Sequence, residues 1–248
     1  MSLLSIKSLS KNFGGLQALN QITLDVTEGS VHGLMGANGA GKTTLFSIIA
    51  GNQRATTGTI LFAGQPINGL RPDQVCKRGI SRTFQIVRPF AGLTVRENVE
   101  IAILYGRQKP PKVSEAAALA QDILADIGLD ALSDQPAGSL TLSGRKRLEV
   151  ARALGTEPRL LMLDEVMAGL TPVEVTDMIA SLRRVKDSHG LTILIIEHVM
   201  SALTDMSDTI TVLHHGEKIA QGTPQQIADN AAVQEAYFGI AEPLEAPV

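Results

Sequence analysis

The chain has little cysteine, no excess of basic residues and no long apolar segment. Its 248 residues include one cysteine, Cys76, so an internal disulfide or a cysteine metal cluster cannot form, and we expect a small buried or neutral side chain there. The formal net charge of -3 lacks the basic excess that nucleic-acid binding usually leaves. We therefore expect a protein of a reducing compartment with no nucleic-acid partner.

The sequence also shows neither a membrane-spanning segment nor a secretory signal. No uninterrupted apolar run approaches the roughly 20 residues that a membrane-spanning helix needs. The start Met-Ser-Leu-Leu-Ser-Ile-Lys lacks the layout of a secretory signal. We expect a cytoplasmic protein whose association with the inner face of the cell membrane depends on a partner.

Apolar patterns along the chain predict an α/β core. Residues 3–27 alternate short apolar stretches with glycine and polar residues, which is typical of antiparallel strands and turns. Further strands are expected at residues 30–35, 160–163 and 191–196. Helical spacing of apolar residues across 175–185 predicts a crossover helix that joins the last two as parallel strands.

Two more segments complete the predicted organisation. The alanine-rich run at residues 114–127 is strongly helical and belongs to a helical lobe inserted into the core. Residues 209–213 and 217–220 flank His215-Gly216 and predict a hairpin. We predict a single domain, with a tail that is poorly ordered. Its parts are an α/β core of residues 1–86 and 155–240, a helical subdomain of residues 87–154, and a tail of residues 241–248.

The most specific motif is a glycine-rich loop that follows the strand at residues 30–35 and precedes an apolar helix at residues 44–50. It matches G-x-x-x-x-G-K-[ST] with Gly36, Ala37, Asn38, Gly39, Ala40, Gly41, Lys42 and Thr43, and Thr44 completes the predicted nucleotide site. Glycines let successive N–H groups point at phosphate oxygens, and the helix adds its positive end. Lys42 is predicted to bridge the β- and γ-phosphates, and the Thr43 hydroxyl to bind Mg²⁺. A plain glycine turn would not explain Lys42-Thr43 at the helix start.

Two adjacent carboxylates follow the apolar strand at residues 160–163. Charged groups at a buried strand end are costly unless they meet a metal or have a catalytic task. We predict that Asp164 holds Mg²⁺, directly or through water, and that Glu165 accepts the proton of the attacking water. A solvated strand end is the alternative interpretation of this pair.

Two further candidates depend on their position. His198 follows the strand at residues 191–196, so its imidazole could reach the γ-phosphate from the same sheet edge, although a single histidine is more often structural. Gln85 lies where the core passes into the helical lobe, and its amide could contact Mg²⁺ or the attacking water. A P-loop alone does not choose among kinases, GTPases and motor ATPases.

Together these features resemble, in order and approximate spacing, the ATP-binding subunits of ABC transporters over nearly the whole chain. The resemblance implies a RecA-like P-loop core with an N-terminal antiparallel β subdomain and an inserted helical subdomain, and it implies ATP and Mg²⁺ as ligands. It makes residues 36–43 Walker A, Asp164-Glu165 the end of Walker B, Gln85 the Q-loop and His198 the switch histidine. Phe13 takes the position of the aromatic that stacks on adenine. A guanine-reading Asn-Lys-x-Asp sequence is absent, which argues against a GTPase.

The segment in the place of the family signature, usually Leu-Ser-Gly-Gly-Gln, is altered. Counting back from the ending at residues 151–154 fills the slot with Leu140, Thr141, Leu142, Ser143 and Gly144. A shifted interpretation, residues 142–146, keeps Leu-Ser-Gly but changes the spacing, so we prefer the first. In the family this segment opens a helix toward the γ-phosphate bound by the opposite subunit. Thr141 keeps a hydroxyl and Ser143 an N–H, so weakened anion binding is predicted.

Three segments most resemble the ATP-binding subunits of branched-chain amino acid importers, a group that also handles urea, short amides and some aromatic acids. They are residues 82–85, residues 165–172 and residues 235–239. In the second segment, Val166 replaces the family's usual proline and Thr171 its usual aspartate. Coupling between subunits is therefore expected to differ there.

The resemblance also implies partners. Two ATP-binding subunits, alike or different, close head to tail around two ATP molecules and move integral membrane permease subunits, with a periplasmic or extracellular solute-binding protein involved indirectly. A soluble ABC-type ATPase that acts on nucleic acid or ribosomes is an alternative, but such proteins usually carry two ATPase units or a long coiled-coil insert. A small-molecule P-loop kinase is a third hypothesis, which predicts phosphoryl transfer to an acceptor.

Overall fold

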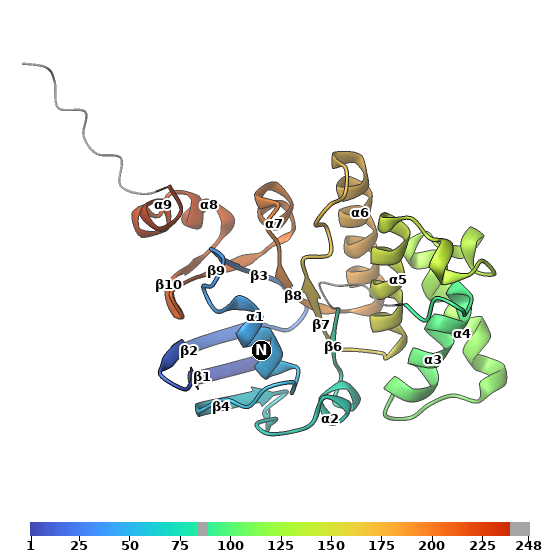
Figure 1. The fold of residues 1–248 in the computed structure, drawn as a ribbon, viewed down its shortest axis with the longest axis horizontal. Helices are drawn as coiled ribbons and strands as arrows, with labels where there is room; N and C mark the ends of the chain where they lie inside the picture. The colour runs from blue at the N-terminus through green and yellow to red at the C-terminus, as the bar shows by residue number, and fades with distance from the viewer. Residues whose placement is uncertain (84–88, 239–248) are drawn as a thin grey trace, which may run out of the picture.

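A six-stranded, mostly parallel sheet forms the centre of the computed structural model, which describes residues 1–83 and 89–238 (Figure 1). Its strand order is β10-β9-β3-β8-β7-β6, and all neighbours are parallel except the β9–β10 hairpin. The strands are β3 (Val31–Gly36), β6 (Ile80–Arg82), β7 (Leu160–Asp164), β8 (Thr192–Ile196), β9 (Thr209–His214) and β10 (Glu217–Gly222).

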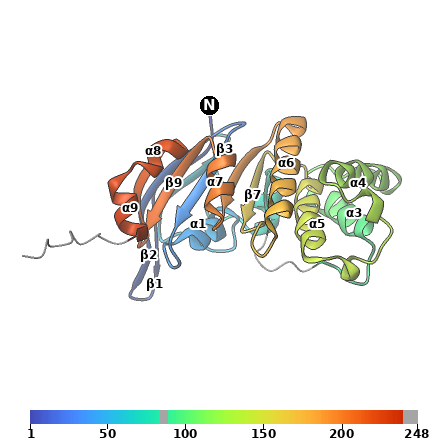
Figure 2. The ribbon, with the colours of Figure 1, turned by 90° about the horizontal axis from the view of Figure 1, so that it is seen from above.

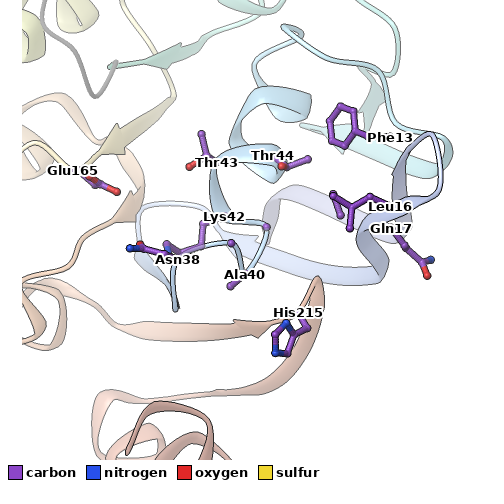
Figure 3. Close-up of a pocket in the computed structure, with 13 residues that line it drawn as sticks. Phe13, Leu16, Gln17, Asn38, Ala40, Lys42, Thr43, Thr44, Glu165 and His215 are labelled. Atoms are coloured by element: carbon purple, nitrogen blue, oxygen red, sulfur yellow. The ribbon is translucent and has the colours of Figure 1, made fainter.

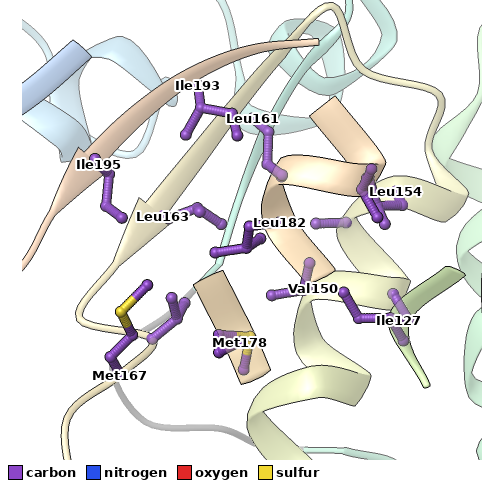
Figure 4. Close-up of a cluster of buried hydrophobic side chains, with 14 of the residues drawn as sticks. Ile127, Val150, Leu154, Leu161, Leu163, Met167, Met178, Leu182, Ile193 and Ile195 are labelled. Carbon is purple, nitrogen blue, oxygen red and sulfur yellow. The ribbon is translucent and has the colours of Figure 1, made fainter. Parts of the chain in front are cut away.

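The central strands are apolar on both sides because both faces of the sheet are covered. Every residue of β3, β7 and β8 is buried. Along β7, Leu161 and Leu163 point into one apolar cluster, whereas Leu160 and Met162 point into another on the opposite face. Figure 4 shows the first cluster, in which Leu182 of the crossover helix lies against these strands.

The connections between the parallel strands are helical. Helix α6 (Pro172–His189) joins β7 to β8 as predicted, and it begins with a capping box of Thr171 and Glu174. It ends at Gly190, which adopts the left-handed conformation that glycine tolerates best. Helix α7 (Met200–Met206) joins β8 to β9, and α6 and α7 contact each other.

A second sheet lies beside the core and is antiparallel. It has four strands in the order β2-β1-β4-β5, as expected for the N-terminal subdomain. Helix α1 (Lys42–Ile49) packs between the two sheets, and its buried apolar side chains share one apolar cluster with both. The strands are β1 (Ser2–Phe13), β2 (Leu16–Thr27), β4 (Thr57–Phe62) and β5 (Gln65–Pro66).

Three helices form a layer at one end of the molecule, far from the C-terminal helices (Figure 2). They are α3 (Val95–Gly106), α4 (Val113–Ile127) and α5 (Leu142–Gly155). Each pair of these helices is in contact, and α5 also contacts β6 and β7 of the core. The remaining helices are α2 (Pro72–Lys77), α8 (Pro224–Ala228), α9 (Ala231–Phe238) and two short 3₁₀ turns, Asp130–Leu132 and Ala137–Ser139.

The structure confirms the predicted fold class: a P-loop α/β core with an N-terminal antiparallel β subdomain and an inserted helical subdomain. Within residues 1–83 and 89–238, no helix combines the length and the apolar character that a membrane span requires.

Candidate functional site

Three buried strands end next to one another at one edge of the six-stranded sheet. β3 ends at Gly36, β7 at Asp164 and β8 at Ile196, and all three run in the same direction. The segments that follow them therefore leave the sheet at the same edge. Ligand sites of open α/β sheets form at such carboxyl-terminal edges, so this is where the predicted residues converge.

The loop between β3 and α1 has the backbone of a phosphate-binding loop. Gly39 and Gly41 adopt positive φ angles of 81° and 102°, which side-chain-bearing residues avoid. At Gly36, an added Cβ would lie 2.5 Å from the carbonyl oxygen of Leu213, so the loop can pack on β9 only with glycine there. Helix α1 begins at Lys42, and its positive N-terminal end therefore adjoins the loop.

Lys42 is buried at the start of α1. It is 6% exposed, and its Nζ donates to the carbonyl oxygens of Gly36 at 2.5 Å and Ala37 at 3.0 Å. Burial lowers the pKa of Lys42, while the nearby Glu165 and Asp164 carboxylates oppose this effect. The ammonium group therefore contacts the loop carbonyls and is near enough to the two predicted carboxylates to interact with their charge.

A cavity of about 540 Å³ opens along the loop (Figure 3). The predicted residues in its wall are Phe13, Asn38, Gly39, Ala40, Gly41, Lys42, Thr43, Thr44 and Glu165. Gly36 and Ala37 are not in the wall and instead contact Lys42 through their carbonyl groups. Asp164 and His198 also lie outside the wall and contact other residues of the same sheet edge.

Four wall residues were not predicted from the sequence: Leu16, Gln17, Ala18 and His215. The first three follow Phe13 across the turn between β1 and β2, so their nearness to Phe13 in sequence could have indicated them. His215 comes from the tip of the β9–β10 hairpin, where it adopts a φ of 46°. No motif marks His215, because its place depends on the packing of the hairpin tip, whose Gly216 N–H donates to the Ala40 carbonyl at 3.2 Å.

Phe13 stands at the end of β1 with its ring partly open to solvent. It is 43% exposed, and the Lys11 ammonium lies 4.6 Å from the centre of its ring. Figure 3 shows the ring beside the cavity, on the same side as Thr44. An exposed aromatic face next to a cavity is suited to stacking on a planar ligand.

Asp164 makes a buried ion pair that no sequence pattern predicts. Its Oδ2 lies 2.6 Å from Nη2 of Arg82, and the two side chains are 3% and 9% exposed. Arg82 also donates to the Ser47 hydroxyl of α1 at 3.0 Å, so it links the end of β7 to the helix that follows the loop. The carboxylate is therefore charge-balanced by the protein itself.

The side chains of Glu165 and His198 are in direct contact. Oε1 of Glu165 lies 2.8 Å from Nε2 of His198, although the two residues come from loops after different strands. The Glu165 side chain is 12% exposed and the His198 side chain 46%. Glu165 has a φ of 52°, a conformation that is uncommon for a residue other than glycine and typical of functional sites. Gln85, the remaining predicted catalytic residue, lies outside the described residues.

The predicted signature slot opens α5. Thr141 is the N-cap, and its hydroxyl accepts the Gly144 N–H at 3.2 Å. Leu140 is buried, whereas Leu142 is 50% exposed at the first position of the helix. Ser143 is partly buried in the first turn. The predicted slot therefore lies at the start of a helix.

Comparisons with known proteins agree with this arrangement. Residues 19–168 match the ABC transporter family, and residues 217–242 match a family described as branched-chain amino acid ATP-binding cassette transporter. The high-affinity branched-chain amino acid transport ATP-binding protein BraF of Pseudomonas aeruginosa is 39% identical over 251 residues, covering 96% of this chain and 98% of its own. LivG of Escherichia coli, of the same description, has the same identity and coverage.

Solved structures give the same result. A nucleotide-free ATP-binding cassette of an ABC transporter superposes with a TM-score of 0.88 at 31% identity, covering 98% of this chain and all of its own. A cassette in its ADP conformation has a TM-score of 0.88 at 32% identity, covering 97% of this chain. The chain thus belongs to the ABC transporter family, as one of its ATP-hydrolysing cassettes.

Proposed function

We propose that this chain is the ATP-hydrolysing subunit of an importer for branched-chain amino acids or related small polar solutes. The observation that carries the hydrolytic part is the contact between Glu165 and His198 beside the phosphate-binding loop, at 2.8 Å. The relatives named for branched-chain amino acid transport, and the match of residues 217–242, support the choice of solute.

ATP would lie in the cavity along the loop. The N–H groups of residues 36–43 would surround its phosphates, and the Lys42 ammonium would leave the loop carbonyls for the β- and γ-phosphate oxygens. Phe13 would stack on the adenine at the other end of the cavity. Thr44, which also lines the cavity, would complete the contacts.

The site has a suitable donor set for Mg²⁺. Hydroxyl and carboxylate oxygens are the ligands that this ion prefers, and we assign the exposed Thr43 hydroxyl, the Asp164 carboxylate and the Gln85 amide to it. When bound, the ion neutralises charge that develops on the phosphate oxygens. Because Arg82 already occupies one Asp164 oxygen, contact between Asp164 and the ion through water fits better than full direct ligation.

Hydrolysis would use Glu165 as the general base. The water oxygen bonds to the γ-phosphorus as the bond to the bridging oxygen of ADP breaks, and the water proton passes to the Glu165 carboxylate. His198 orients that carboxylate through its Nε2. The products are ADP and inorganic phosphate, with no acceptor molecule, which separates this activity from that of a P-loop kinase.

We also propose how the chain is assembled and where it works. Residues 1–86 and 155–240 form the core, residues 87–154 the helical subdomain and residues 241–248 a tail. A second ATP-binding subunit, alike or different, would complete each site with its signature slot. Integral permease subunits would hold the pair at the inner face of the cell membrane. A solute-binding protein outside the membrane would deliver the solute.

Uptake of radiolabelled leucine tests this function. Cells whose own chain is replaced by Glu165→Gln should lose leucine uptake, whereas the control Lys77→Met, at an exposed lysine of α2, should keep it. Competition by unlabelled valine, urea or short amides then defines the solute class. Leucine uptake that persists in cells whose Glu165→Gln protein has lost ATP hydrolysis would contradict the proposed solute.

A further inference from the structure

Lys146 is a buried lysine whose charge is directed at the catalytic loop. It lies on α5, one turn after the signature slot, and is 4% exposed. Its Nζ donates to the main-chain carbonyl of Glu165 at 2.8 Å. Lysines are almost never this buried unless the ammonium group has a partner. The side chain therefore connects the signature helix to the main chain of the proposed general base.

Glu197 makes a second contact with the same loop, from the end of the neighbouring strand β8. It follows β8, immediately before His198, and is 3% exposed. Its Oε1 accepts the Met167 N–H at 2.9 Å, and its Oε2 has no hydrogen-bond partner among the described residues. Burial raises the pKa of Glu197 to about 7, opposed by the Met167 amide and the Lys146 charge and assisted by the Glu165 charge.

The loop that receives these contacts carries Glu165 in a strained conformation. Glu165 has a φ of 52°, and such a conformation persists only where the surroundings enforce it. Its N–H donates to the Ile196 carbonyl at 2.9 Å, its carbonyl accepts from Lys146, and Met167 two residues later is held by Glu197. The Met167 side chain is itself buried in the apolar cluster (Figure 4). Main-chain groups on both sides of the Glu165 side chain are thus fixed.

We propose that Lys146 and Glu197 are positioning residues that hold residues 165–167 so that the Glu165 carboxylate faces His198. Because Lys146 belongs to α5, it would also tie the signature slot of one ATP site to the general base of the other site within the same chain. The inference rests on the proposed role of Glu165. Neither residue lines the cavity along the phosphate loop, so both should act on turnover and not on ATP binding.

Paired substitutions in the full-length chain separate this role from simple structural support. Lys146→Met keeps the length of the side chain but removes the donor, and it should lower kcat roughly 10- to 100-fold because small displacements of a catalytic group are costly. The dissociation constant of ATP should change less than about twofold, since the phosphate loop is untouched. Lys146→Arg keeps a donor and should recover most of the turnover. Lys77→Met is the matched control on an exposed helix position.

Glu197 offers an independent pair of variants. Glu197→Gln keeps an acceptor for the Met167 N–H and should keep kcat within about threefold of wild type. Glu197→Leu removes the acceptor and should lose turnover as Lys146→Met does, again with ATP binding preserved. Equal turnover of the two Glu197 variants would overturn the proposed contact, even if Lys146→Met failed to fold.

The deciding experiment combines Lys146→Met with Glu165→Gln and measures phosphate release and ATP binding for wild type, both single variants and the double variant. If Lys146 acts through Glu165, it should lower the residual turnover of Glu165→Gln by less than about twofold. Wild-type turnover in Lys146→Met, or the same fold-loss in both backgrounds, would overturn the inference. Full turnover in Glu165→Gln would instead refute the proposed role of Glu165, so the two failures are distinguishable.

Discussion

The phosphate loop and the signature slot each lie at the start of a helix, but the first turns of the two helices are capped differently. At α1 the N-cap is Gly41, and no side chain of the described residues caps the helix. At α5 the hydroxyl of the N-cap Thr141 accepts a hydrogen bond from the Gly144 N–H. The α1 start thus offers its N–H groups to a ligand, whereas α5 already satisfies one of its own.

The two segments also differ in sequence, because residues 36–43 keep the family pattern and residues 140–144 depart from it. A loop that surrounds phosphates must leave donors open, and glycines with positive φ together with Lys42 are the residues that allow this. A helix start that a partner's phosphate only approaches can be built in more than one way, provided that its N–H groups point outward. Substitutions in the two regions should therefore affect different measurements.

The largest effect on the free energy of unfolding is expected at the buried Arg82–Asp164 ion pair, which links the end of β7 to the helix after the phosphate loop. Arg82→Met leaves the Asp164 carboxylate buried without its cation and should reduce the free energy of unfolding by about 3–5 kcal/mol. Urea unfolding measures this. Arg71→Met is the control, because the Arg71–Asp73 pair is exposed and should contribute nothing measurable. Equal unfolding midpoints for the two variants would show that the buried pair has no special role.

A slightly smaller effect on the free energy of unfolding is expected at Glu197, which holds the loop after β7 through the Met167 N–H, and this effect changes with pH. The unfolded chain ionises this carboxyl near pH 4.5 and the folded chain near pH 7, so the folded state retains a proton between these values. Stability is therefore lost as the pH rises through this window, by about 3 kcal/mol in total. Glu197→Gln cannot ionise, so its stability relative to wild type should increase from pH 5 to pH 8 in urea unfolding. A constant difference would contradict the raised pKa.

A substitution at Lys42 tests whether the phosphate loop binds ATP. Lys42→Ala removes a charged donor from the proposed phosphate contacts and should weaken ATP binding roughly 10- to 100-fold by calorimetry. Lys77→Ala removes an exposed lysine and should bind ATP as wild type does. Unchanged affinity in Lys42→Ala would mean that the nucleotide lies elsewhere.

The smallest effect is expected at the cap of α5. Thr141→Ala removes the acceptor of the Gly144 N–H and should cost about 1 kcal/mol of unfolding free energy. Thr141→Ser keeps the hydroxyl and should lose much less. If Thr141→Ala instead left stability unchanged, the hydroxyl would not be capping the helix in solution, and the contrast between the two helix starts would fail.

Much of this organisation could be predicted from sequence, because local patterns determine it. Apolar runs that end at Gly36 and Asp164 indicate buried parallel strands, and the spacing of apolar residues in α6 indicates the crossover between β7 and β8. Once those strands are neighbours, the order of the motifs brings His198 to Glu165. The phosphate loop is a continuous segment and needs no tertiary information.

The contacts that were missed join side chains to distant partners. Arg82 forms an ion pair with Asp164, which is 82 residues away in the sequence. The partner of Lys146 is a main-chain carbonyl, which no sequence pattern marks. His215 reaches the cavity only because a hairpin tip packs on the loop. Such contacts depend on how whole elements are packed, which composition and periodicity do not specify.

The most direct test of the central claim is phosphate release by the purified chain with Mg-ATP, compared between wild type and Glu165→Gln, with ATP binding measured on both. We expect Glu165→Gln to bind ATP as wild type does but to release phosphate roughly 10²- to 10⁴-fold more slowly, because the general base is lost. Normal turnover in Glu165→Gln would contradict it, since another group would then have to accept the proton of the attacking water.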